Sequence, residues 1–113
     1  MQPLRCVLLG TEIVPAADEV GFIRWHQLLE NRRIAYTTLG EGRFVSTIFL
    51  GENRGTDAKP EWFETLIAGV PTLRVENNQY LLHSGTYAAA MAGHQAMVDR
   101  AAAQLNRKKT PSA

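Results

Sequence analysis

Three polar side chains inside apolar segments carry the residue types of acid–base and nucleophilic chemistry. Ser46 and Thr47 interrupt the segment RFVSTIFLG, and Glu64 interrupts the segment WFETLI. If these segments pair as strands, the Glu64 carboxylate approaches a hydroxyl and could act as an acid or a base. His94, on the last predicted helix, would complete a set of serine, histidine and acid. These four residues are the candidate catalytic groups.

The remaining histidines and the cysteine predict no metal or cofactor site. His26, His83 and His94 lack the spacing of metal ligands, and a single cysteine forms neither an internal disulfide nor a multi-cysteine zinc site. Cys6 lies in an apolar run, where a thiol is ordinarily inert. The chain has no phosphate-binding loop, dinucleotide motif or zinc-protease motif. For His94, a hydrogen-bonded core position is favoured over catalysis, because it falls on an apolar helical stripe.

Aromatic and loop residues provide the candidate binding surface. Tyr36, Trp62 and Tyr80 are the aromatic candidates, and Arg54 lies in the polar loop at 52–60. Exposed aromatic and arginine side chains are typical of protein interfaces. The alternative for each residue is an ordinary position in the core or in a loop.

Apolar spacing and turn residues predict the elements that must position these groups. Short turns at Gly10-Thr11, GEG and Asn77-Asn78 separate β-branched and aromatic segments, and two other segments have helical spacing. The predicted strands are 4–9, 12–14, 34–39, 43–50, 62–67, 72–76 and 79–83, and the predicted helices are 16–32 and 86–105.

This order predicts an α+β fold, in which an antiparallel β-sheet has two helices packed on one face as a two-layer sandwich. Strands joined by tight turns favour antiparallel pairing. The strand RFVSTIFL is apolar on both faces, with Phe44, Ile48 and Leu50 on one parity and Val45 and Phe49 on the other. Strands of this kind are usually covered on both sides, so we expect a homodimer through the uncovered face.

Charge and length indicate one domain without a strong affinity for nucleic acid. The 113 residues carry 12 Lys+Arg and 11 Asp+Glu, and we expect a single domain at 1–106 with a flexible basic tail at 107–113. Without Arg107-Lys108-Lys109, nine basic residues face eleven acidic ones. An acidic body disfavours nucleic-acid binding through this run and Arg32-Arg33.

The chain has neither of two sequence signs of membrane targeting. No apolar run approaches the ~20 residues that span a bilayer, and the N-terminal residues lack the pattern of a signal peptide. We therefore expect a cytoplasmic protein with no membrane partner.

Four short motifs follow one another along the chain: VLLGTEIVP at 7–15, VSTIFLG at 45–51, FETL at 63–66 and AGHQAMV at 92–98. Their order resembles that of a family of small uncharacterised phage and prophage proteins, over roughly residues 5–102. Two departures are Ala88-Ala89, where the family has acidic residues, and the loop after Gly51, which lacks the family's Asp-His. The resemblance implies a phage-related context, in a bacterium or a phage-infected cell, and supplies no mechanism.

These observations favour a non-enzymatic accessory protein that binds a host or phage protein, or a second copy of itself. One alternative is a small enzyme that uses Glu64 with Ser46, Thr47 or His94. Another alternative is weak nucleic-acid binding through the basic tail. Convergence of the polar side chains would favour the enzyme, and an exposed apolar patch would favour the binding protein.

Overall fold

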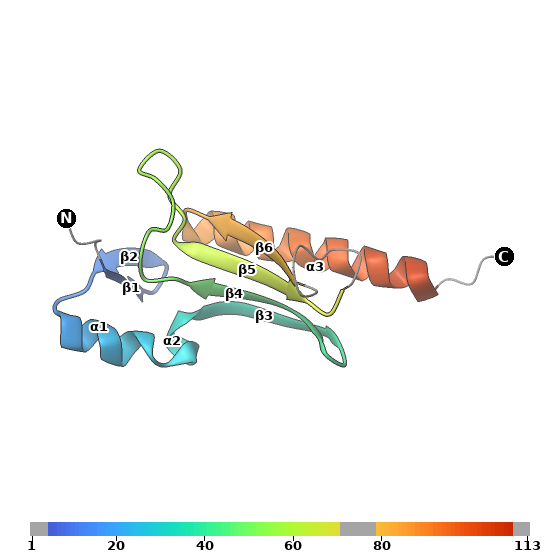
Figure 1. Cartoon of the computed structure of the whole chain (residues 1–113), viewed down its shortest axis with the longest axis horizontal. Coiled ribbons are helices and arrows are strands. Elements are labelled where there is room, and N and C mark those ends of the chain that lie inside the picture. Colours follow the sequence, from blue (N-terminus) through green and yellow to red (C-terminus); the bar gives the residue numbers. More distant parts are fainter. Residues whose placement is uncertain (1–4, 71–78, 110–113) are drawn as a thin grey trace.

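The fold is α+β with antiparallel sheets (Figure 1). The computed structural model describes residues 5–70 and 79–109, and side chains are described for 5–70 and 82–105. The elements are β1 (Cys6–Leu9), β2 (Glu12–Pro15), α1 (Glu19–His26), α2 (Leu29–Arg32), β3 (Arg33–Gly40), β4 (Arg43–Phe49), β5 (Phe63–Ala68), β6 (Gln79–Ser84) and α3 (Tyr87–Lys109).

Two sheets hold the strands in the order in which they occur along the chain. β1 and β2 form a hairpin, and β3, β4, β5 and β6 form an antiparallel meander. Figure 1 shows α3 running lengthwise along the meander, with the hairpin and α1 gathered at one end. Both predicted hairpins and the strands β5 and β6 are confirmed, while the predicted strand at 72–76 and the Asn77-Asn78 turn lie outside the described residues.

The single helix predicted at 16–32 is two helices. Asp18 starts α1 later than expected, because its carboxylate accepts a hydrogen bond from the Gly21 N–H at 2.6 Å. Leu28 has an extended backbone, and the Asn31 side chain donates to the Trp25 carbonyl at 2.9 Å. The apolar spacing continues through this break, which is why periodicity alone missed it.

The core lies between α3 and the meander. Side chains alternate along a strand, so every second residue of β4 and β5 faces α3. The side chains on this face that are no more than 1% exposed are Val45, Thr47, Phe49, Phe63, Thr65 and Ile67. Trp25 of α1 packs edge-on against Phe49 at a ring distance of 5.8 Å, so α1 reaches the same face at its end.

Small residues bring α3 close to the sheet. Ala90 and Ala101 are fully buried, and a Cβ at Gly93 would lie 3.0 Å from a methyl carbon of Leu82.

α3 continues to Lys109, so the basic run 107–109 is helical in its backbone, whereas we expected a tail from residue 107. The reason is that no helix breaker precedes Pro111. Among the described helices, none combines the length and apolar character needed to cross a membrane.

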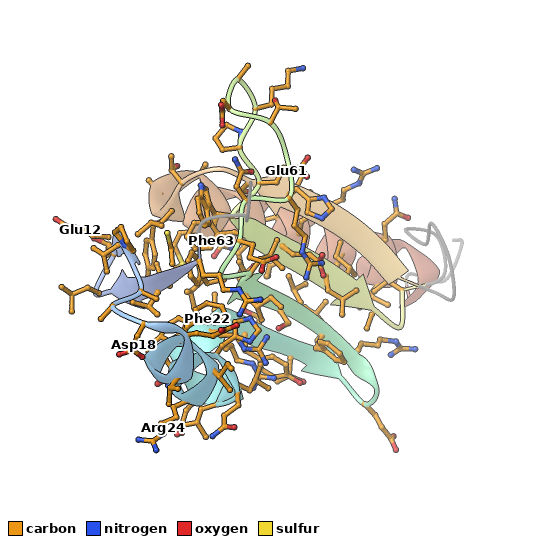
Figure 2. The ribbon with its side chains drawn as sticks, turned by 60° about the vertical axis from the view of Figure 1, so that its left-hand side comes forward. Glu12, Asp18, Phe22, Arg24, Glu61 and Phe63 are labelled. Carbon is orange, nitrogen blue, oxygen red and sulfur yellow. The ribbon has the colours of Figure 1, made fainter. Side chains whose placement is uncertain are left out.

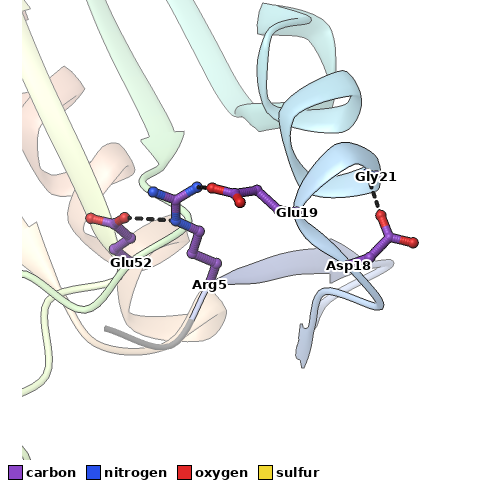
Figure 3. Close-up of polar contacts among 5 residues, drawn as sticks. All are labelled: Arg5, Asp18, Glu19, Gly21 and Glu52. Carbon is purple, nitrogen blue, oxygen red and sulfur yellow. Dashed lines mark hydrogen bonds and ion pairs between the residues drawn. The ribbon is translucent and has the colours of Figure 1, made fainter. Parts of the chain in front are cut away.

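Arg5 ties the N-terminal elements to the end of β4 (Figure 3). Its guanidinium lies 3.1 Å from the Glu19 carboxylate and 3.4 Å from that of Glu52. It also lies over the Phe22 ring, which points from α1 toward the body of the molecule (Figure 2). Gly51 closes this junction with a φ of +84°, and a Cβ there would lie 2.9 Å from the Phe22 ring. The glycine at the end of VSTIFLG therefore permits close packing of α1.

Candidate functional site

A chain of hydrogen bonds links α3 to three strands beneath it. The His94 ring lies between two hydroxyls, with Nε2 2.9 Å from Thr37 Oγ1 and Nδ1 2.8 Å from Thr47 Oγ1. Thr47 Oγ1 lies in turn 2.7 Å from Thr65 Oγ1. His94 is 5% exposed, and burial lowers its pKa from the ordinary value of 6.5. The ring is therefore held neutral, with one nitrogen donating and the other accepting.

This arrangement matches the core position that we favoured for His94. The ring has both nitrogens satisfied by hydroxyls, and it is shielded from solvent by α3 and the sheet. A general base must reach the proton that it removes from a substrate. The observed contacts therefore explain His94 as a polar link that sets the register of α3 on the sheet.

The four candidate catalytic residues are divided between the two faces of the sheet. Thr47 faces α3 and meets His94, whereas Ser46, the preceding residue of β4, faces the opposite side. Glu64 pairs with Ile48 on that opposite side, and its Oε2 lies 3.3 Å from His83 Nε2. The alternative site was Glu64 with Ser46, Thr47 or His94. Thr47 and His94 lie on the opposite face of the sheet from Glu64, because adjacent strand residues point in opposite directions, whereas Ser46 shares the face of Glu64.

The sheet face that looks away from α3 is the candidate functional site, and we call it the open face. Strand register places the following described residues on it: Arg33, Tyr36, Thr38, Phe44, Ser46, Ile48, Glu64, Leu66, Ala68 and His83. Tyr36 is 48% exposed. In Figure 1 no described helix lies over this face of the meander. α3 covers the other face of the same sheet.

An aromatic stack with a cation occupies one side of the open face. The rings of Tyr36 and Phe44 stack at 5.4 Å with an interplanar angle of 26°. The Arg33 guanidinium lies 4.5 Å from the centre of the Tyr36 ring. On the opposite side, Glu64 pairs with His83. The open face therefore combines apolar and aromatic side chains with charges of both signs, which is the composition of a recognition surface.

The other candidate binding residues have different environments. Trp62 is partly buried and stacks on Phe49 at 6.0 Å with an angle of 8°, so it packs against the core instead of forming an exposed patch. Arg54 is exposed on the loop between β4 and β5, and its N–H donates to the Glu61 carbonyl. Tyr80 is in β6, and its side chain lies outside the described residues.

The loop between β4 and β5 stands out from the body of the molecule and is ordered by one side chain (Figure 1). Asn53 Oδ1 accepts from the N–H groups of Gly55 at 2.9 Å and Glu61 at 2.8 Å. Its Nδ2 donates to the Thr56 carbonyl at 3.3 Å. Glu61 lies at the base of the loop (Figure 2). The Asn53 side chain therefore joins the two ends of the loop. The sequence gives no sign of this role, because the neighbouring residues are polar as well.

We expect Asn53→Ala to loosen this loop while the sheet remains folded. The change removes all three hydrogen bonds and should lower the free energy of unfolding by about 1–2 kcal/mol. Hydrogen exchange would measure the effect as faster exchange of the Gly55 and Glu61 amides. Asn31→Ala is the matched control and should leave those two amides protected. Equal protection in wild type and Asn53→Ala would contradict the role of this side chain.

Exposed apolar residues on α1 and α2 were missed by the sequence analysis. Val20, Ile23, Leu28 and Leu29 are all exposed, although the leucines belonged to the apolar stripe of the single predicted helix. The break after Gln27 turns the leucines out of that stripe. Val20 and Ile23 are three residues apart, on a different side of α1 from the buried Phe22. This spacing could have predicted a second apolar side of the helix.

The described residues offer no metal centre and no activated thiol. No group of three or more His, Cys, Asp or Glu side chains in this part of the chain could hold a metal ion. Burial raises the pKa of the Cys6 thiol above its usual value of 9.0, which disfavours the reactive thiolate.

Comparisons with protein-family models, curated proteins and solved structures find no match to this chain.

Proposed function

We propose that this chain is a phage-related accessory protein that acts by binding a protein through the open face. The observation that carries the proposal is the half-exposed Tyr36, stacked on Phe44 and capped by Arg33. Tyrosine and arginine dominate the binding energy of many protein interfaces, because they combine apolar area with hydrogen-bonding groups. The phage context is supported by the order of the sequence motifs.

The division of the polar residues supports binding over catalysis. An enzyme needs a nucleophile, a base and an orienting group converging on one point. Here His94 and Thr47 bond to each other beneath α3, while Glu64 bonds to His83 on the other face. The proposed mechanism is therefore association, in which apolar area on the open face is removed from water.

A photoreactive side chain at position 36 tests this proposal. Tyr36 is replaced by benzoylphenylalanine, which has a similar shape, and the cells that produce the protein are irradiated. We expect covalent adducts with protein from position 36, because this ring is half-exposed on the open face. The same group at Ala103, exposed on the outer side of α3, is the control and should give few adducts.

The identity of the adduct decides between the functions. Protein adducts that depend on position 36 and disappear with Phe44→Arg support the proposal. Adducts that nuclease treatment destroys would contradict it and favour nucleic acid, for which exposed aromatic and arginine side chains also serve as stacking platforms. Equal labelling from positions 36 and 103, or no labelling at either, would also contradict it.

A further inference from the structure

The connection between β4 and β5 is much longer than the geometry of these strands requires. Antiparallel neighbours can be joined by a two-residue turn, and Glu41-Gly42 joins β3 to β4 in this way. β4 and β5 are also antiparallel neighbours, yet residues 50–62 separate them. These residues form the loop that stands out from the body of the molecule (Figure 1). Long surface loops whose ends lie close together and whose own groups order them are frequently functional.

The loop is ordered by bonds within itself. In addition to the bonds of the Asn53 side chain, a tight turn closes the tip. The Thr56 N–H donates to the Lys59 carbonyl at 3.0 Å, and the Lys59 N–H donates to the Thr56 hydroxyl at 3.0 Å. A Cβ at Gly55 would collide with the Lys59 carbonyl, so glycine is needed for the two halves of the loop to approach this closely. The loop is therefore a narrow projection with a defined shape.

The base of the loop is fixed to the body of the molecule. The Leu50 N–H donates to the Trp62 carbonyl at 2.8 Å, and the Trp62 N–H donates to the Ser84 carbonyl at 2.9 Å. A Cβ at Gly85 would lie 2.7 Å from the Pro60 carbonyl oxygen, so the second half of the loop packs against the segment between β6 and α3. A loop that is already ordered in this way avoids most of the entropy that binding costs a flexible loop.

The exposed side chains of the projection carry more positive than negative charge. The exposed residues are Arg54, Thr56, Asp57, Ala58 and Lys59. In the part of the chain that the structure describes, the ion pairs do not include Arg54 or Lys59, whereas Glu52 at the base is paired with Arg5. The two cations can therefore pair with carboxylates of another molecule.

We propose that this loop enters a narrow, acidic cleft of a partner protein, where Arg54 and Lys59 pair with carboxylates. This adds a second contact surface to the open face. A narrow projection fits a concave surface, and opposite charges matched across such a contact also speed the encounter of the two proteins. Nucleic acid fits less well, because Asp57 lies in the turn at the tip, where its carboxylate would face the phosphates.

A photoreactive side chain at the tip of the loop tests the proposal. Ala58 is exposed, and it is replaced by benzoylphenylalanine in the full chain. The purified chain is added to a lysate of the cells that naturally produce the protein, and the mixture is irradiated. We expect a protein adduct that the unlabelled wild-type chain suppresses by competition. The concentration of unlabelled chain that halves the adduct is the quantity compared between variants.

Charge variants of the unlabelled chain test the acidic cleft. Arg54→Glu and Lys59→Glu should each raise the halving concentration by about tenfold or more, because each replaces an attraction by a repulsion. Asp57→Asn should lower it by about twofold, because the variant removes a negative charge near the partner's carboxylates. Arg24→Glu is the matched charge control and should compete like wild type, since Arg24 is exposed on α1, away from the loop (Figure 2).

A change in the order of the loop tests its fixed shape without altering a side chain at the tip. Asn53→Ala removes the bonds that join the two ends of the loop, so binding must then order them. We expect the halving concentration to rise by about tenfold. Asn31→Ala is the matched control and should compete like wild type. Urea unfolding confirms that every variant is folded, and if Asn53→Ala is not, the charge variants decide the question.

The outcomes either support or overturn the proposal. Weaker competition by both glutamate variants and by Asn53→Ala, with Arg24→Glu unchanged, supports it. The absence of an adduct from position 58 overturns it, as does wild-type competition by the glutamate variants or by folded Asn53→Ala. An adduct that nuclease treatment destroys also overturns it and assigns the loop to nucleic acid. Labelling from position 36 reports on the open face, so the proposed function and this inference can fail separately.

Discussion

Replacement of Phe49 by alanine should lower the free energy of unfolding by about 3–5 kcal/mol, the range measured for fully buried phenylalanine. Phe49 has no exposed surface, and its ring contacts Trp25 at 5.8 Å, Trp62 at 6.0 Å and Phe63 at 5.3 Å. These rings belong to α1, to the loop before β5 and to β5. The substitution therefore leaves a cavity where three parts of the chain meet. Equilibrium unfolding in urea measures the loss.

Tyr36→Ala is the matched control for Phe49→Ala. Tyr36 is also an aromatic residue of the meander, but it is 48% exposed and sits on the open face. We expect Tyr36→Ala to lower the free energy of unfolding by about 1 kcal/mol, because less apolar area is returned to water. A similar loss for both variants would show that the two faces of the sheet are equally packed, contrary to the observed burial.

Acidification below pH 6.5 should destabilise the fold through His94. Burial lowers the pKa of this histidine in the folded protein, so the unfolded chain binds a proton that the folded chain does not. The stabilisation is fully present above pH 6.5 and is lost as the pH falls toward the folded-state pKa. The slope contributed by one such group approaches about 1.4 kcal/mol per pH unit. Midpoints of urea unfolding between pH 7.5 and pH 5 would measure this loss of stability.

Two glutamine variants assign this pH dependence to one residue. Among the described residues, the groups that bond to the His94 ring are hydroxyls, and they include no carboxylate to stabilise a charged ring. His94→Gln keeps a donor and an acceptor but removes the titration, so the slope below pH 6.5 should flatten. His83→Gln, on the open face, is measured in parallel as the removal of a histidine that does not contact His94. An unchanged slope in His94→Gln would refute the assignment.

Local sequence was sufficient to predict most of the strands. The β-branched and aromatic segments, with glycine at their turns, are confirmed as β1 to β5, and β6 is confirmed at 79–84. The break at Gln27-Leu28 was missed because the apolar spacing persists through it. Trp62 was assigned to a binding surface, although it stacks on Phe49. An aromatic residue next to a strand has the same sequence pattern in either environment.

The sequence by itself determined that Ser46 and Thr47 face opposite sides of β4, because the side-chain period of a strand is two. It also determined that both sides of β4 are apolar. The tertiary structure alone decided which side α3 covers. That decision depends on the packing of Ala90, Gly93 and Ala101 against the sheet and on the long-range bonds from His94 to Thr37 and Thr47. The bonds from His94 join residues more than forty positions apart, a separation that no local pattern records.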